Sequence, residues 1–187
     1  MAEKRLILAS GSPRRSELLS KMGYTFETCA QDVDEHISGV PSEIVRTLAV
    51  RKAHAAAEHT SGVVIASDTL VSLDSKPLGK PADAEDAKRM LRALSNREHE
   101  VFTGVCVLDT ETGREEVRVE RTGVHFRPIA ETEIEEYVQT GEPMDKAGAY
   151  AIQGGACVFV DALDGSFSNV MGFPTKAVRE MLSHFGL

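Results

Sequence analysis

One carboxylate, Asp68, stands out because of the apolar residues on both sides of it. It follows the run at residues 63–67 and precedes a second apolar stretch at residues 70–73. A carboxylate at the end of a buried strand must be solvated, paired or bound to a metal, because burying a lone charge is unfavourable. Ligands commonly bind at strand ends in α/β sheets. We therefore predict that Asp68 belongs to a ligand site; the alternative is a polar bend formed by Asp68 and Thr69.

A second group of residues has the chemistry of a phosphate site. At residues 10–15 a polar turn leads into a helix, with Ser12 as the N-cap and Pro13 at the first helical position. The N–H groups of a helix start attract anions, and Arg14 and Arg15 add two permanent charges. This turn predicts phosphate binding; the alternative is an ordinary strand-to-helix turn with solvated arginines.

Three carboxylates within residues 32–35 and two lysines could complete such a site. The acidic cluster predicts a metal-binding corner that includes Glu35, or else a solvated loop. Lys52 lies on a predicted helix, where surface exposure is the usual alternative. Lys80 lies between Gly79 and Pro81, and a loop constrained in this way could place its ammonium against phosphate.

Gln153 precedes a pair of glycines in a segment of small residues. A side-chain amide offers a donor and an acceptor side by side, so it could contact the edge of a nucleobase. A glutamine in a loop is otherwise simply solvated. The segment is therefore a candidate for base recognition.

The elements that must position these residues follow from periodicity and from Gly and Pro punctuation. We expect a mixed α/β protein in which two long strands form a hairpin with one wet face. The expected strands are residues 6–9, 24–29, 63–67, 70–73, 98–108, 115–126 and 157–160, and the expected helices are 14–22, 41–59, 84–94 (capped by Asp83), 131–140 and 175–184.

Composition limits the functional classes. A chain of 187 residues with 42% hydrophobic residues can bury a substantial core and fits a single domain. A formal net charge of -8 argues against a surface that holds nucleic acid stably, but it permits a small phosphate ligand in a cleft. The three cysteines are widely spaced, which predicts buried free thiols. No run resembles a signal peptide or a membrane span, so we expect a cytoplasmic protein without membrane contact.

Several of these segments together resemble the Maf family of nucleoside triphosphate pyrophosphatases. The resemblance runs from about Leu6 to the final helix, in the family's order and spacing. Ser67 departs from it, because many members have Ala there. The matching segments are SGSPRR at 10–15, SDT at 67–69, GKP at 79–81, DKAGAY at 145–150 with IQG at 152–154, and NVMGFP at 169–174.

The resemblance implies one Maf-like domain over residues 1–187. Its fold would be the inosine-triphosphate-pyrophosphatase-like (Maf/Ham1) α/β fold, with an elongated mixed sheet flanked by helices and a cleft between two lobes. The implied reaction is hydrolysis of a nucleoside triphosphate to the monophosphate and pyrophosphate with a divalent metal, Mg²⁺ or Mn²⁺. A homodimer is also implied.

Residue by residue, the resemblance assigns Asp68 as the proton acceptor and Glu35, Lys52 and Lys80 as further charged cleft residues. We assign the metal to Glu35 and Asp68, since both supply oxygen ligands. Members that prefer dTTP and UTP carry Arg, Thr and Gln at three specificity positions, which correspond here to Arg14, Thr69 and Gln153. The predicted phosphate-binding set is Ser10, Ser12, Arg14, Arg15, Lys52 and Lys80.

Two other functions compete with a dTTP and UTP pyrophosphatase that has a house-cleaning role. The first is a pyrophosphatase for 7-methyl-GTP or for a broader range of nucleotides; the 7-methyl-GTP branch carries a bulky aromatic where Arg14 stands. The second is a non-catalytic regulator of septum formation and cell division. A chain that combines the enzyme with a role in cell-division arrest is also compatible with the sequence.

Overall fold

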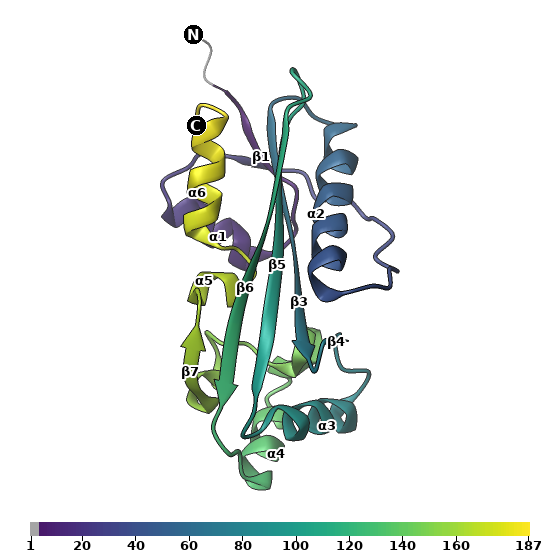
Figure 1. The fold of residues 1–187 in the computed structure, drawn as a ribbon, viewed down its shortest axis with the longest axis vertical. Coiled ribbons are helices and arrows are strands. Elements are labelled where there is room, and N and C mark those ends of the chain that lie inside the picture. The colour runs from purple at the N-terminus through teal and green to yellow at the C-terminus, as the bar shows by residue number, and fades with distance from the viewer. Residues whose placement is uncertain (1–3) are drawn as a thin grey trace. The chain divides into compact units, whose positions relative to one another are not determined.

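The computed structural model describes residues 4–187, which divide into two compact units. Unit 1 contains the described residues up to Asp68, residues 103–120 and residues 172–187; unit 2 contains residues 69–102 and 121–171. The chain passes from one unit to the other within strands β3 (Val63–Leu73), β5 (Glu98–Asp109) and β6 (Glu115–Phe126), and again between Met171 and Gly172 (Figure 1).

The remaining elements are helices, short 3-10 segments and short strands. The helices are α1 (Pro13–Lys21), α2 (Pro41–Ala57), α3 (Ala84–Leu94), α4 (Glu131–Gln139), α5 (Phe167–Val170) and α6 (Thr175–His184). The 3-10 segments are η1 (Glu142–Asp145), η2 (Ala147–Ala149) and η3 (Gly155–Phe159), and the short strands are β1 (Leu6–Leu8), β2 (Glu27–Thr28), β4 (Lys76–Leu78) and β7 (Val160–Asp164).

The described strands form a mixed seven-stranded sheet with the order β2-β1-β3-β5-β6-β7, and β4 pairs with β3. Strand β1 is parallel to both of its neighbours, and Ile7 is in register with Val64 of β3. Strands β4 and β7 are antiparallel to β3 and β6. The predicted mixed α/β class is therefore confirmed.

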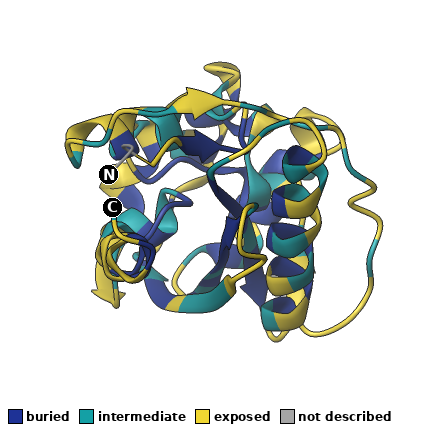
Figure 2. Cartoon of the chain, turned by 90° about the horizontal axis from the view of Figure 1, so that it is seen from above, coloured by how far each residue is buried: buried dark blue, intermediate teal, exposed yellow. Residues whose placement is uncertain are grey.

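Unit 1 is a three-layer arrangement around the N-terminal strand (Figure 1). Alternate residues of a strand point to opposite faces: Leu6 and Leu8 pack with α1 and α6, whereas Ile7 and Ala9 pack with the alanine-rich face of α2. The strands are mostly buried, and the helices are buried only on their inner sides (Figure 2). Such small residues on α2 allow a close approach: an added Cβ at Gly104 of β5 would collide with the backbone of Val45.

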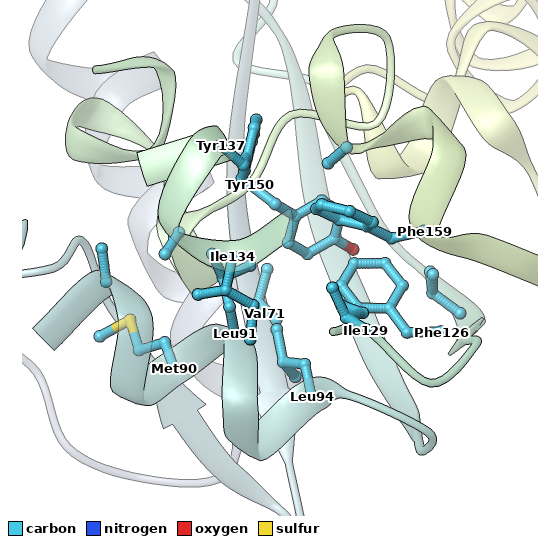
Figure 3. Close-up of a cluster of buried hydrophobic side chains, with 14 of the residues drawn as sticks. Val71, Met90, Leu91, Leu94, Phe126, Ile129, Ile134, Tyr137, Tyr150 and Phe159 are labelled. Carbon is cyan, nitrogen blue, oxygen red and sulfur yellow. The ribbon is translucent and has the colours of Figure 1, made fainter. Parts of the chain in front are cut away.

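Unit 2 has its own core, in which α3 and α4 pack with aromatic side chains (Figure 3). Leu91 and Leu94 come from α3 and Ile134 comes from α4. The ring of Phe126 packs edge-on against those of Tyr150 and Phe159, at 4.9 and 6.1 Å between centroids, a favourable arrangement for aromatic pairs.

Most of the predicted helices and the long β5–β6 pair are confirmed within one or two residues, but several expectations were wrong. Residues 157–159 are not in a strand: the chain is in a 3-10 turn up to Phe159, and β7 begins at Val160. Strand β2 is only Glu27–Thr28. Cys157 is exposed, and only Cys106 is fully buried; all three thiols are free.

No helix within residues 4–187 is long and apolar enough to cross a membrane.

Candidate active site

The carboxylate of Asp68 is buried in the middle of a strand. We predicted that the strand would stop at Asp68, but β3 continues through it to Leu73. The side chain of Asp68 is only 13% exposed, and the mainly apolar residues before it are fully buried. Burial raises the pKa of Asp68, and the positive charge of Lys52 opposes this increase. Asp68 is thus a carboxylate with raised proton affinity and a specific cationic partner.

Lys52 is the centre of a cluster of three charges in unit 1. Its Nζ lies 2.6 Å from Asp68 Oδ1 and 2.7 Å from Glu35 Oε1. Helix α2 positions Lys52, whose side chain is only 15% exposed and is therefore not the surface lysine of the alternative interpretation. Glu35, in the irregular segment before α2, is exposed for 61% of its side chain. The cluster therefore has one buried and one open carboxylate.

Arg15 joins the predicted phosphate turn to the C-terminal part of unit 1. Its Nε donates to the Gly172 carbonyl at 3.0 Å and its Nη1 donates to Ser10 Oγ at 3.3 Å. The same carbonyl accepts a hydrogen bond from Ser67 Oγ at 3.3 Å. Burial lowers the pKa of Arg15, an effect opposed by the negative charges of Asp68 and Glu35. An arginine keeps its charge even so, and these bonds hold it within the field of the two carboxylates.

The turn itself has the expected backbone. Ser12 is at the N-cap of α1 and Pro13 is at the first helical position, as predicted, but the Ser12 side chain makes no capping bond. Instead, the Ser12 N–H donates to Ser10 Oγ at 3.2 Å. Arg14 follows at the start of the helix and is half-buried. Two cations and a helix N-terminus therefore coincide at this turn, the combination that favours an anion.

The donor set of this cluster fits a divalent cation that shares its coordination with a substrate. Within residues 4–187, no group of three or more His, Cys, Asp and Glu side chains could hold a metal. Glu35 and Asp68 share one cation, Lys52. Magnesium typically binds through one or two carboxylates together with substrate phosphates and water. Glu35 and Asp68 could therefore hold Mg²⁺ or Mn²⁺ only together with substrate phosphates and water.

The structure places three of the predicted residues, Thr69, Lys80 and Gln153, in unit 2. Thr69 is half-buried and follows Asp68 on β3, whereas Lys80 and Gln153 are exposed. Lys80 follows β4 in a loop whose Gly79 carbonyl accepts the Gly148 N–H at 3.0 Å. Gln153 lies in the turn before η3. The motifs GKP and DKAGAY are thus joined by a backbone hydrogen bond within one unit.

Two residues of the motif at 169–174, to which the sequence alone assigned no individual role, accept or donate hydrogen bonds that join distant segments. The carbonyl of Gly172 positions Arg15, as described above. The fully buried Asn169 donates to the Val101 carbonyl and to Thr122 Oγ1, at 3.1 and 2.9 Å. The motif at residues 169–174 was the available signal, but a motif does not reveal which carbonyl accepts a bond.

The fold is that of Ham1-type proteins. The structure is similar to the Ham1 protein of Staphylococcus aureus, with a TM-score of 0.57 and 16% identity over 97% of this chain and 99% of that one. A HAM1 protein from Coxiella burnetii is similar over 97% and 100% of the two chains, with a TM-score of 0.58 and 16% identity. At such low identity the likeness defines the fold class only, and that class is the one expected from the sequence.

Sequence comparison gives the family. The family profile described as "Maf-like protein" matches residues 5–185, and the chain belongs to the Maf family. The dTTP/UTP pyrophosphatase of Desulforamulus reducens is 47% identical over 97% of each chain. That of Geobacter sulfurreducens is 47% identical over 100% of this chain and 99% of its own.

Proposed function

We propose that this protein hydrolyses dTTP and UTP to the nucleoside monophosphate and pyrophosphate. The observation that carries the proposal is the ion-pair cluster of Asp68, Lys52 and Glu35 near the arginine-bearing turn, in a chain 47% identical to dTTP/UTP pyrophosphatases. Such a cluster combines a base with the positive charges that phosphoryl transfer needs.

Asp68 acts in this proposal as the general base. It takes a proton from a water molecule, whose oxygen bonds to the α-phosphorus while the bond from that phosphorus to the bridging oxygen breaks. The electron pair of the broken bond leaves with pyrophosphate. Burial raises the pKa of Asp68, and the positive charge of Lys52 opposes that increase; a base works best when its pKa lies near the operating pH. The ionised form of Asp68 accepts the proton, and the adjacent ammonium of Lys52 favours that form.

The cations of the cluster neutralise the charge that develops on the phosphates. Arg15 and Lys52 are held in place by hydrogen bonds, so little reorganisation is needed when the charge develops. Arg14 and Lys80, together with the polar groups of Ser10 and Ser12, are the other proposed phosphate contacts. Mg²⁺ or Mn²⁺ on Glu35 and Asp68 would supply further positive charge to the phosphate oxygens.

Base specificity is proposed to depend on Arg14, Thr69 and Gln153. Thymine and uracil share a carbonyl, N–H, carbonyl edge, and the Gln153 amide can bond to two adjacent groups of it. Cytosine presents a donor in place of O4, so the same site would leave polar groups unpaired. Arg14 is in place of the bulky aromatic that the resemblance assigns to 7-methyl-GTP enzymes.

We also propose a cytoplasmic homodimer that binds no nucleic acid stably. Strand β7 is the last strand of the sheet order, and its surroundings expose Val158 (59%), Leu163 (38%) and Phe167 (47%). Exposed apolar side chains beside an edge strand favour association with another chain. Light scattering after size exclusion should give twice the mass of the chain, and Leu163→Lys should give the monomer mass.

The proposed activity is tested by measuring pyrophosphate release from dTTP, UTP, CTP, dATP, GTP and 7-methyl-GTP, with Mg²⁺, with Mn²⁺ and with a chelator. We expect metal-dependent turnover of dTTP and UTP above the others. Preference for a purine would keep the Asp68 chemistry and refute the specificity assignment. No turnover of any nucleotide would refute the enzyme and favour the regulatory alternative.

A further inference from the structure

The turn that carries Gln153 is fixed at both ends. Residues 151–155, here called the Gln153 turn, have an exposed glutamine directly after two buried residues, Ala151 and Ile152. The Gly154 N–H donates to the Ala151 carbonyl at 3.0 Å and closes the turn. Its two end residues donate their N–H groups to side chains of other elements in unit 2.

Tyr137, from α4, holds the first end of the turn. Its hydroxyl accepts the Ala151 N–H at 3.0 Å. Burial and the nearby carboxylate of Glu142 raise the pKa of Tyr137. Tyr137 lies in the buried cluster of unit 2, which fixes its ring (Figure 3).

Glu142, the first residue of η1, holds the other end. Its Oε2 accepts the Gly155 N–H at 3.0 Å. An added Cβ at Gly154 would collide with this carboxylate, and one at Gly155 would approach Tyr137 Cε2 to 3.0 Å. The glycine pair therefore leaves room for the two side chains packed against it, and neither glycine has a positive φ.

From these contacts we propose that Tyr137 and Glu142 are positioning residues for pyrimidine recognition: together they fix the Gln153 turn so that the amide meets the base edge in one orientation. The inference rests on the proposed function, since it assumes that Gln153 contacts the base. A fixed amide discriminates between uracil and cytosine, whereas a mobile one can adapt to either edge.

The test compares kcat and KM for UTP and CTP in Tyr137→Phe and Glu142→Ala. The first variant keeps the ring against Gly155 and loses only the hydroxyl. We expect kcat/KM for UTP relative to CTP to fall about tenfold in each, mainly through the KM for UTP. Because the two residues hold the same turn, the double variant should lose less than the product of the single effects. Glu136→Ala, at an exposed position of α4, and Tyr24→Phe in unit 1 are the matched controls.

Amide hydrogen exchange, measured by NMR on the same proteins, reports on the turn independently of activity. The amides of Ala151 and Gly155 should exchange faster in both variants, whereas the Gly148 amide, bonded to the Gly79 carbonyl, should be unchanged. Folded variants that keep the wild-type UTP preference would overturn the proposal, even with faster exchange. If the wild-type protein itself does not turn over UTP, the proposed function fails, and that result is distinct from a variant-specific one.

Discussion

The two units bury polar groups in opposite ways. In unit 1, Asp68 and Lys52 are nearly buried as an ion pair, with Glu35 as a second partner. Unit 2 instead has a neutral buried pair: His99 Nε2 lies 2.7 Å from the Tyr150 hydroxyl, and burial lowers the pKa of His99 to about 4. A group that becomes neutral on burial avoids the free-energy cost of taking a charge out of water, whereas a buried ion pair still carries that cost. We interpret the charged pair of unit 1 as part of the reacting site and the neutral pair of unit 2 as part of the structure that positions other residues.

The largest stability effect is expected from Lys52→Met, which removes the cation of the unit 1 cluster. Breaking a buried pair in this way costs about 3–5 kcal/mol. With Lys52 absent, the pKa of Asp68 rises further above that of the unfolded chain. As pH rises, the Asp68 carboxyl therefore ionises in the unfolded chain at a lower pH than in the folded one. Ionisation then favours the unfolded state, so the variant should be least stable at high pH. Urea unfolding at pH 5 and pH 8 measures this dependence.

Lys176→Met is the control for that experiment, since Lys176 is exposed on α6. It should leave stability unchanged at both pH values. An equal loss at pH 5 and pH 8 in Lys52→Met would mean that the buried charge of Asp68 is not the cause, and the contrast between the units would lose its electrostatic basis.

The neutral pair of unit 2 predicts a different pH dependence. The pKa of His99 is about 4 in the folded protein against 6.5 for a free side chain, so the unfolded state binds the proton first as pH falls. The stability associated with neutral His99 is present above pH 6.5 and is lost toward pH 4, by about 3 kcal/mol.

His99→Gln should remove most of this slope in unfolding experiments between pH 4 and pH 7. His59→Gln, at an exposed position, should keep it. If both variants retain the wild-type slope, another group is responsible for the acid sensitivity.

A smaller effect separates two glycines of unit 2 that have the same backbone conformation. Gly148 and Gly141 have φ values of 72° and 75°, and a side chain there costs about 1–2 kcal/mol. A Cβ at Gly148 would also approach Val71 Cγ1 to 2.9 Å, whereas Gly141 has open space. Thermal unfolding should therefore show a greater loss for Gly148→Ala than for Gly141→Ala. Equal losses would show that Val71 moves freely.

The smallest effect compares the helix starts of the two units. Asp83 caps α3 by accepting the Asp86 N–H at 2.8 Å, and Asp83→Ala should cost about 1 kcal/mol. Ser12 makes no such bond at α1, so Ser12→Ala should change stability by only a few tenths of a kcal/mol. Chemical denaturation can resolve the two. A comparable loss at Ser12 would contradict the capping geometry of unit 1.

Local patterns predicted much of this fold, because helix periodicity and capping residues are local signals. The helix after Asp83 and the long β5–β6 pair are examples. The continuation of β3 through Asp68 could not be predicted, since a charge within a strand is tolerated only when a distant partner such as Lys52 is present. Residues 157–159 have β-forming side chains but adopt a 3-10 turn, where the Arg127 N–H donates to the Phe159 carbonyl at 2.9 Å.

In the candidate site, too, the sequence predicted the residue identities but not the tertiary contacts between them. Motifs identified Asp68, Lys52, Glu35 and Arg15, which the structure brings together in unit 1. They did not reveal the carbonyl of Gly172 as the acceptor for Arg15 or the clamp of Tyr137 and Glu142 on the Gln153 turn. These contacts depend on tertiary structure between residues far apart in the chain.

The central claim, that Asp68 is the base of a pyrophosphate-releasing hydrolase, is tested most directly by Asp68→Asn. The amide keeps the size of the side chain and cannot take the proton, so pyrophosphate release from UTP should fall by about 10²–10⁴-fold with unchanged circular dichroism. Asp32→Asn, in the exposed acidic segment, should retain activity. A folded Asp68→Asn protein that releases pyrophosphate at the wild-type rate would contradict the account.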